Sequence, residues 1–169
     1  MRIFGRRPSP ATARRTGLIR RTRLIAQKWK KQMINNSESG SRRATSHALE
    51  DHLAEWSLQT GITVEIWALP KQPLPALITE IVHGTIRDVL QEVEQQAQAR
   101  TVSIALTVAP AGLRLTVSDD GLGTSAKAYG ASLGGRRVEL AGIGGRLTVN
   151  GVQGNGTTVS ATVPRRAFG

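Results

Sequence analysis

Two adjacent carboxylates followed by two glycines form the part of the sequence best suited to bind a ligand. Asp119 and Asp120 precede Gly121 and Gly123, directly after an apolar run. A carboxylate at such a turn can accept a hydrogen bond from a ligand amine, and the glycines let the backbone approach a ligand closely. The same spacing also suits an ordinary turn between strands, so both interpretations stay open.

Two further glycine clusters follow along the chain. Residues 130–135 open a predicted helix, and the free N–H groups at the start of a helix suit phosphate. Gly154, Gly156 and Thr157 lie where a strand is predicted to begin. Each cluster alone is typical of a turn, and their order along the chain is the stronger signal.

Strands and helices are predicted around these clusters. Alternating apolar residues predict strands at 62–67, 102–108, 113–117, 146–150 and 157–163. A period near 3.6 predicts a long helix over Pro75–Ala99 and a short one over Arg137–Ile143. Because each helix has one apolar stripe to bury, the order predicts an α/β fold, a two-layer sandwich of sheet and helices.

The basic residues are concentrated ahead of these elements. Residues 1–43 hold thirteen of the 23 Lys and Arg but one of the twelve Asp and Glu, whereas residues 44–169 hold ten bases and eleven acids. We therefore predict a basic arm and linker over residues 1–43 and a nearly neutral domain over residues 44–169. Hydrophobic residues make up 39% of the chain, enough for a packed core, and the absence of Cys excludes disulfides and thiolate metal sites.

The arm contains a predicted basic amphipathic helix. Leu18, Ile25, Trp29 and Met33 recur at helical spacing among basic residues. Residues 14–34 would then suit an anionic membrane surface, an acidic protein or nucleic acid, or would pack on their own domain. The sequence has no run of about 18 uncharged apolar residues, so we expect a cytoplasmic protein, at most peripheral to a membrane.

In this order the glycine clusters resemble the motifs of the histidine kinase and Hsp90-like (GHKL) ATPase superfamily. The resemblance is closest to the ATP-binding domain of short two-component sensor histidine kinases, and it spans about Leu49 to Pro164. It implies the Bergerat fold, a mixed sheet covered by helices on one face. The family's glycine boxes are matched by Asp119, Gly121 and Gly123, then by Gly130, Ser132, Leu133 and Gly135, then by residues 142–147, and finally by Gly154, Gly156, Thr157 and Val159.

The resemblance implies a pocket for ATP or ADP with Mg²⁺. Asp119 would bind the adenine amino group, Gly121 and Gly123 would let the base approach, and Thr157 would support it through water. The residues implied to bind the nucleotide are Asp88, Asp119, Gly121, Gly123, Gly130, Leu133, Gly135, Gly156 and Thr157, with Asp88 as the metal ligand.

The helix over Pro75–Ala99 departs from the family's pattern at two positions. Gly84 stands where family members have a Glu that orients or deprotonates the attacking group, and Asp88 stands where they have an Mg²⁺-binding Asn. Asp88 could still hold a hard cation through oxygen. Glu80 and Glu92 are either substitute bases or, as we favour, solvated helix residues. No catalytic residue is assigned, so the resemblance leaves enzyme activity open.

None of the three histidines matches the family's phospho-accepting residue. His47 and His52 lie in residues 46–58, which resemble the end of the family's second dimerisation helix, and neither is followed by an acid. We expect both on a helix surface. His83 falls inside the long helix next to the predicted pocket, where we expect it to pack.

The leading hypothesis is a divergent ATP-binding regulatory protein of bacterial signal transduction, with weak or absent kinase activity and a regulatory protein as partner. One alternative is a non-enzymatic interaction module that binds no nucleotide and is tethered by its basic arm. Another is an active kinase that phosphorylates a partner in trans. A homodimer is compatible with all three.

Overall fold

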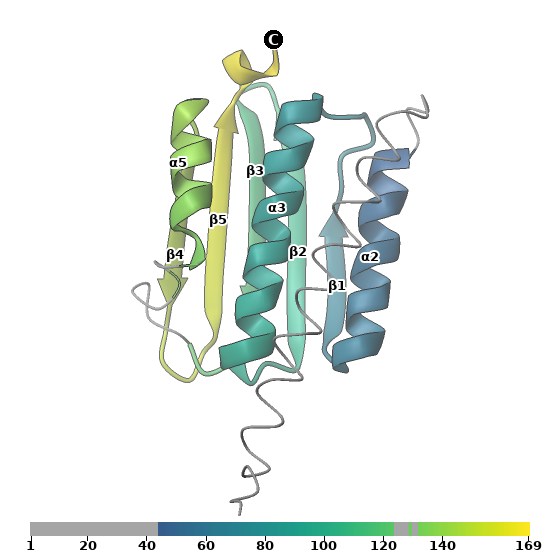
Figure 1. The fold of residues 1–169 in the computed structure, drawn as a ribbon, viewed down its shortest axis with the longest axis vertical. Helices are drawn as coiled ribbons and strands as arrows, with labels where there is room; N and C mark the ends of the chain where they lie inside the picture. Colours follow the sequence, from purple (N-terminus) through teal and green to yellow (C-terminus); the bar gives the residue numbers. More distant parts are fainter. Residues whose placement is uncertain (1–43, 124–128, 130–131) are drawn as a thin grey trace, which may run out of the picture. The chain divides into compact units, whose positions relative to one another are not determined.

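The described part of the chain forms one five-stranded mixed sheet with helices on one face. The structure is a computed structural model, which describes residues 44–123, Tyr129 and residues 132–169. Helices α2 (Ala44–Thr60), α3 (Ala76–Glu92) and α5 (Gly134–Gly142) lie on the same side of the sheet (Figure 1). The predicted two-layer α/β sandwich with helices on one face is therefore confirmed.

The strands are arranged in the order β1-β2-β3-β5-β4. Their bounds are Thr63–Ala68 for β1, Thr101–Ala109 for β2, Gly112–Asp119 for β3, Arg146–Gly151 for β4 and Thr157–Pro164 for β5. β1 pairs with β2 in parallel, and the other neighbours are antiparallel. The register places Asp119 opposite Thr157, so two of the predicted site residues are cross-strand neighbours.

The core lies between the sheet and the helices. Every second residue is buried along β3 and β5, and along β2 as far as Leu106, as period-two alternation requires. The strands contribute Val102, Ile104, Leu106, Leu113, Leu115, Val117, Val159, Ala161 and Val163, which meet α2 and α3 residues such as Leu53, Trp56, Ile78, Ile86 and Leu90. Each fully buried aliphatic side chain of this kind contributes about 1.5–3 kcal/mol. The opposite face is polar, with Ser118 and Thr158 hydroxyls 2.9 Å apart.

Helix α2 extends over residues that the sequence analysis described only by their resemblance to a dimerisation helix. Leu49, Leu53 and Trp56 are at most 4% exposed and anchor it to the domain. It ends at Gly61, whose φ of +74° and N–H bond to the Ser57 carbonyl (2.9 Å) are typical of a helix C-terminus. The spacing of Leu49, Leu53 and Trp56, four and three residues apart and followed by Gly61, could have predicted this helix from the sequence.

Helix α3 is shorter than the predicted Pro75–Ala99. It begins at Ala76, after Pro75, and continues from Val93 to Ala97 as a π-helical turn. The turn ends at Gln98, whose φ of +50° is left-handed. A π-helical turn of five residues is too short to appear as a change of period, so periodicity does not detect it.

Helix α5 begins at Gly134, three residues before the predicted start at Arg137. The predicted helix leaves out Gly134 and Gly135, and glycine is a poor helix former. The Leu133 carbonyl nevertheless accepts the Arg137 N–H at 3.0 Å, so the first turn is closed.

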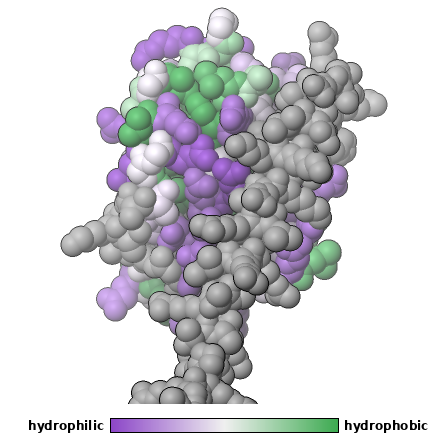
Figure 2. Space-filling view, viewed as in Figure 1, coloured by the Kyte–Doolittle hydropathy of each residue, from purple (hydrophilic) through white to green (hydrophobic). Residues whose placement is uncertain are grey.

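The helix-bearing face is mixed in character. Figure 2 shows hydrophilic residues in the middle of this face and hydrophobic residues near its upper end. Within the part of the chain that the structure describes, no helix combines the length and the apolarity needed to cross a membrane. The predicted arm over residues 1–43, with its helix, lies outside the described residues.

His52 and His83 lie close enough across α2 and α3 for their charges to interact. His83 is 7% exposed, as expected for a packing residue. His52 was expected on the surface, but it is partly buried because it faces α3. Burial lowers the pKa of each imidazole to about 4.

These histidines predict a loss of stability in mild acid. Below pH 6.5 both histidines become protonated in the unfolded chain, but in the folded chain they stay neutral until about pH 4. The free energy of unfolding therefore decreases as the pH falls through this window. For His83 alone the free energy of unfolding should fall by roughly 2 kcal/mol between pH 7 and pH 5. Urea unfolding of the wild type and of His83→Gln measures this, and equal pH slopes for the two proteins would contradict it.

Candidate functional site

The site predicted from the glycine clusters lies at one edge of the sheet. β3 ends and β5 begins there, and the N-terminal end of α5 points toward the same edge (Figure 1). The antiparallel pairing of β3 with β5 brings the residues of two clusters together although 38 positions separate Asp119 from Thr157 in the chain.

Asp119 is a buried carboxylate at the end of the central strand β3. Its residue is 8% exposed, and its Oδ1 accepts the Gly121 N–H at 2.9 Å. Burial raises the pKa of this carboxyl, while hydrogen bonds from the backbone of Gly121 and Thr157 oppose the rise. A carboxylate held in one orientation in a poorly solvated place binds an amine or amide donor strongly.

Two of the predicted glycines bring turns of the protein itself into contact. A side chain at Gly123 would overlap the carbonyl of Val152, and one at Gly156 would overlap the carbonyl of Asp119. Both have φ above +70°. The turn interpretation therefore accounts for these two positions whether or not a ligand binds.

Asp120 supports the turn rather than the pocket. Its Oδ1 accepts the N–H groups of Arg100 (2.7 Å) and Thr101 (2.8 Å), which fixes the start of β2. The Thr101 hydrogen bond is the main reason why the pKa of this exposed carboxyl is lowered. The adjacent acids thus have separate roles, which their spacing did not reveal.

Tyr129 lies against the predicted base-binding carboxylate. It is 1% exposed, and its hydroxyl donates to Asp119 Oδ2 at 3.5 Å. Burial, and after it the charges of Asp119 and Glu92, raise the pKa of the phenol. Tyr129 was not among the residues predicted from the sequence to bind a ligand. Its position as an aromatic residue directly before the second glycine cluster was the only sequence feature that could have pointed to it.

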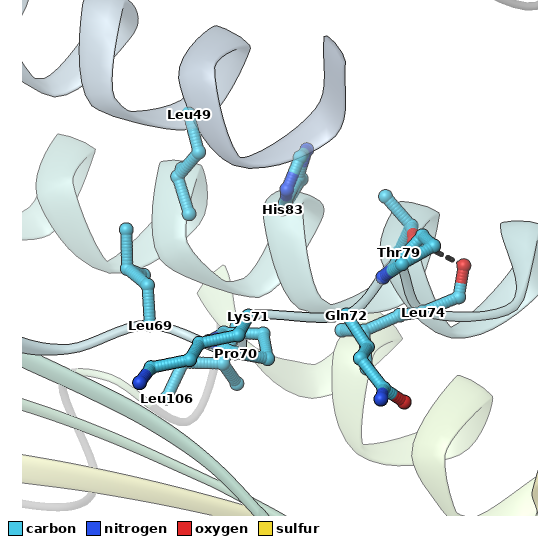
Figure 3. Close-up of a pocket in the computed structure, with 10 residues that line it drawn as sticks. Leu49, Leu69, Pro70, Lys71, Gln72, Leu74, Thr79, His83 and Leu106 are labelled. Carbon is cyan, nitrogen blue, oxygen red and sulfur yellow. Dashed lines mark hydrogen bonds between the residues drawn. The ribbon is translucent and has the colours of Figure 1, made fainter. Parts of the chain in front are cut away.

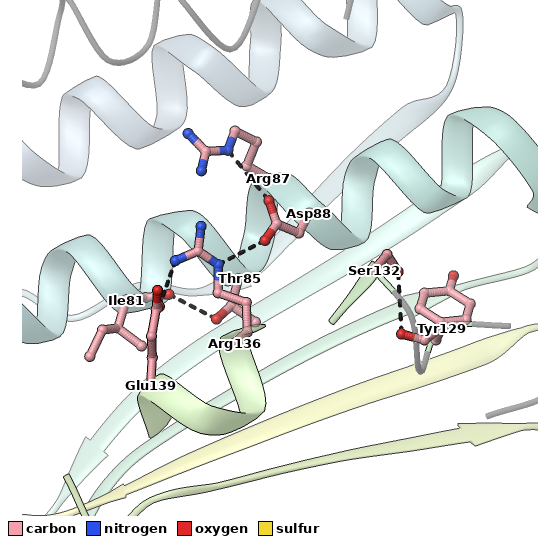
Figure 4. Close-up of polar contacts among 8 residues, drawn as sticks. All are labelled: Ile81, Thr85, Arg87, Asp88, Tyr129, Ser132, Arg136 and Glu139. Carbon is pink, nitrogen blue, oxygen red and sulfur yellow. Dashed lines mark hydrogen bonds and ion pairs between the residues drawn. The ribbon is translucent and has the colours of Figure 1, made fainter. Parts of the chain in front are cut away.

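A second polar group joins α3 to α5 on the other side of the site. Arg136 Nε donates to Asp88 Oδ2 at 2.7 Å, and Arg136 Nη1 donates to Glu139 Oε2 at 2.6 Å (Figure 4). Arg87 Nε lies 3.5 Å from Asp88 Oδ1. Burial alone would lower the pKa of Arg136, but the hydrogen bonds and charges of Asp88 and Glu139 raise it above its ordinary value.

The absence of a side chain at Gly84 makes room for this arginine. A Cβ placed on Gly84 would lie 2.5 Å from Arg136 Cζ and 2.6 Å from both Nη atoms. A Glu at this position would therefore displace the guanidinium from where it lies.

The arrangement does not fit an Mg²⁺ ion at Asp88. Both carboxylate oxygens face arginine nitrogens, at 2.7 and 3.5 Å. In the described ranges, which leave out residues 1–43, 124–128, 130 and 131, no group of three or more His, Cys, Asp or Glu side chains could hold a metal. Asp88, the metal ligand predicted from the sequence, is thus paired with two arginines of the protein.

The two glutamates named as alternatives have different surroundings. Glu80 is exposed, in agreement with the favoured solvated interpretation. Glu92 is 7% exposed and close enough to Tyr129 to affect its titration, so the solvated interpretation is wrong for Glu92. The π-helical turn that begins at Val93 directly follows it.

The remaining predicted binding residues are placed as follows. Thr157 is 2% exposed, beside Asp119 and within reach of the Tyr129 hydroxyl. Leu133 is fully buried and so contributes to the core. Gly135 lies in the first turn of α5 with open space around it. Gly130 lies outside the described residues.

His83 of α3 lies close to His52 of α2. With Leu49, Leu69, Lys71 and Leu74 it lines a cavity of about 40 Å³ among α2, α3 and the loop that follows β1 (Figure 3). A space of this size has room for a few water molecules but not for a nucleotide. His83, at 7% exposed, is therefore a packing residue.

Solved structures of histidine kinases share this fold. The histidine kinase domain of the blue-light activated histidine kinase from Erythrobacter litoralis EL346 superimposes with a TM-score of 0.66 and 21% identity, over 87% of this chain and 74% of that chain. The histidine kinase AdeS of Acinetobacter baumannii gives 0.59 and 10%, over 94% and 86%. The mycobacterial sensor histidine kinase MprB gives 0.55 and 17%, over 70% and 93%.

A curated relative agrees with this likeness. The sensor histidine kinase YxjM of Bacillus subtilis is 23% identical over 113 residues, which are 67% of this chain and 28% of that protein. The chain thus matches about a quarter of the relative's length. No family model matches the sequence.

The contact between the two turns predicts a large effect of Gly156→Ala. The added Cβ would meet the Asp119 carbonyl while φ stays near +78°, so we expect a loss of roughly 3 kcal/mol of unfolding free energy. Gly154→Ala is the matched control, since its φ is also +78° but its Cβ would meet nothing within 4 Å. It should cost roughly 1 kcal/mol. Urea unfolding compares the two, and equal losses would refute the account.

Proposed function

We propose that this chain, whose fold is that of the histidine-kinase-type ATPase domain, is a regulatory protein that binds adenine nucleotides and has weak or absent kinase activity. It would act in bacterial signal transduction through a regulatory protein partner. The observation that carries the proposal is the buried, oriented carboxylate of Asp119 at the end of β3.

The groups around Asp119 suit an adenine base. The carboxylate can accept a hydrogen bond from the exocyclic amine, and Thr157 lies opposite it on β5. The Tyr129 hydroxyl bonds to the same carboxylate at 3.5 Å, a long hydrogen bond that a ligand amine can replace. Nucleotide binding in this account therefore includes displacement of the Tyr129 hydroxyl from Asp119.

The proposal of weak or absent catalysis is supported by the opposite side of the site. General-base catalysis needs a group within hydrogen-bond reach of the attacking atom. Gly84 offers no side chain, and the guanidinium of Arg136 fills the adjacent space. Asp88 is paired with that cation instead of being available to a metal.

Calorimetric titration of ADP and ATP into the full chain tests this function. We expect the wild type to bind both nucleotides with similar affinity, and Asp119→Asn to bind at least about tenfold more weakly, because one charge-assisted hydrogen bond is lost. Unchanged affinity in this variant would disprove the pocket assignment.

Tyr129→Phe serves as the companion variant. It removes the competing hydroxyl and keeps the ring, so it should bind ADP more tightly than the wild type. No binding of either nucleotide up to millimolar concentration would favour the non-enzymatic interaction module. Transfer of label from the γ-phosphate of ATP to a co-expressed partner would favour the active kinase.

A further inference from the structure

The guanidinium of Arg136 sits where two helices face each other, and its surroundings are those of a bound cation. Its side chain is 16% exposed, and carboxylates from both helices contact it, Asp88 from α3 and Glu139 from α5. The Arg136 group also covers Gly84, one helical turn before Asp88. Side chains four apart share a helix face, so Gly84 and Asp88 together form the surface that receives it.

We propose that Arg136 takes the place of a divalent cation, so that this protein binds nucleotide phosphates without a metal ion. The inference rests on the proposed nucleotide binding and concerns how the same site receives its ligand. The chemical class of ligand is a nucleoside diphosphate or triphosphate free of Mg²⁺.

The charges around Arg136 leave little for a metal to bind. Asp88 and Glu139 contribute two negative charges, and Arg136 and Arg87 contribute two positive charges. A divalent ion brought to Asp88 would meet a guanidinium already bonded at 2.7 Å. At such distances like charges repel by several kcal/mol unless water screens them, and Asp88 is only 23% exposed.

The same group retains donors for an anion. Nε and Nη1 are bonded to carboxylates, and neither of these hydrogen bonds uses Nη2. The two N–H groups of Nη2 suit a phosphate oxygen, which guanidinium binds through directed hydrogen bonds. Arg87 adds a second cation 3.5 Å from the same Asp88 carboxylate. The fixed arginine thus supplies directed hydrogen-bond donors for a phosphate oxygen.

The first experiment is titration of ADP into the full chain, once with 5 mM Mg²⁺ and once with EDTA. The wild type should give dissociation constants within about twofold of each other. Arg136→Ala should bind about tenfold more weakly in EDTA and regain part of this loss with Mg²⁺. Arg137→Ala, which alters the exposed neighbour on α5, should behave as the wild type. Binding by the wild type that depends on Mg²⁺ would overturn the proposal.

The second experiment tests metal binding at Asp88 without nucleotide. Mn²⁺, a paramagnetic substitute for Mg²⁺, is added to ¹⁵N-labelled protein while the amide signals of Gly84 and Asp88 are followed. Both signals should keep their widths in the wild type and broaden selectively in Arg136→Ala, or in Arg136→Gln if the alanine variant does not fold. Selective broadening in the wild type would overturn the proposal. If ADP fails to bind under either condition, the proposed function fails, and the Mn²⁺ experiment still decides whether Arg136 excludes the metal.

Discussion

The hydrogen-bonded ion pair between Arg136 and Asp88, 2.7 Å long, connects α5 to α3 across the side of the site where phosphates are expected. Glycine at position 84 leaves room for the guanidinium where it lies, since a side chain there would meet it. One substitution thus has two consequences, the removal of a group that could act as a base and the entry of a fixed cation. A buried charge is tolerated only when it is paired, and here carboxylates on both helices pair with it.

The strands and α3 could be predicted from the sequence because their apolar residues recur with a clear period. β3 and β5 bury every second residue, and the apolar residues of α3 recur near the helical period, although α3 is buried all round over residues 81–86. The prediction started α5 at Arg137, whereas the helix begins at Gly134, a residue of poor helix propensity. The π-helical turn at Val93–Ala97 could not be predicted, because five residues are too few to show a change of period.

The site was predictable in part for a similar reason. Asp119 and Thr157 were both named from their glycine clusters, and strand register brings them together. The partners that determine their chemistry come from elsewhere in the chain: Tyr129 reaches Asp119, and Arg136 reaches Asp88 over 48 positions. A single sequence does not reveal which distant residues pair. Asp88 was therefore predicted as a metal ligand by resemblance, whereas in the structure its carboxylate oxygens contact arginine nitrogens.

Two residues determine how this domain would receive a nucleotide: Asp119, a carboxylate suited to adenine, and Arg136, which lies where a metal ion is expected. The decisive experiment is a crystal structure of the full chain grown with both ADP and Mg²⁺. We expect the adenine amine on Asp119, the Tyr129 hydroxyl displaced, and Arg136 between Asp88 and the β-phosphate with no ion on Asp88. An Mg²⁺ ion bound to Asp88 with Arg136 turned away, or ADP bound apart from Asp119, would contradict it.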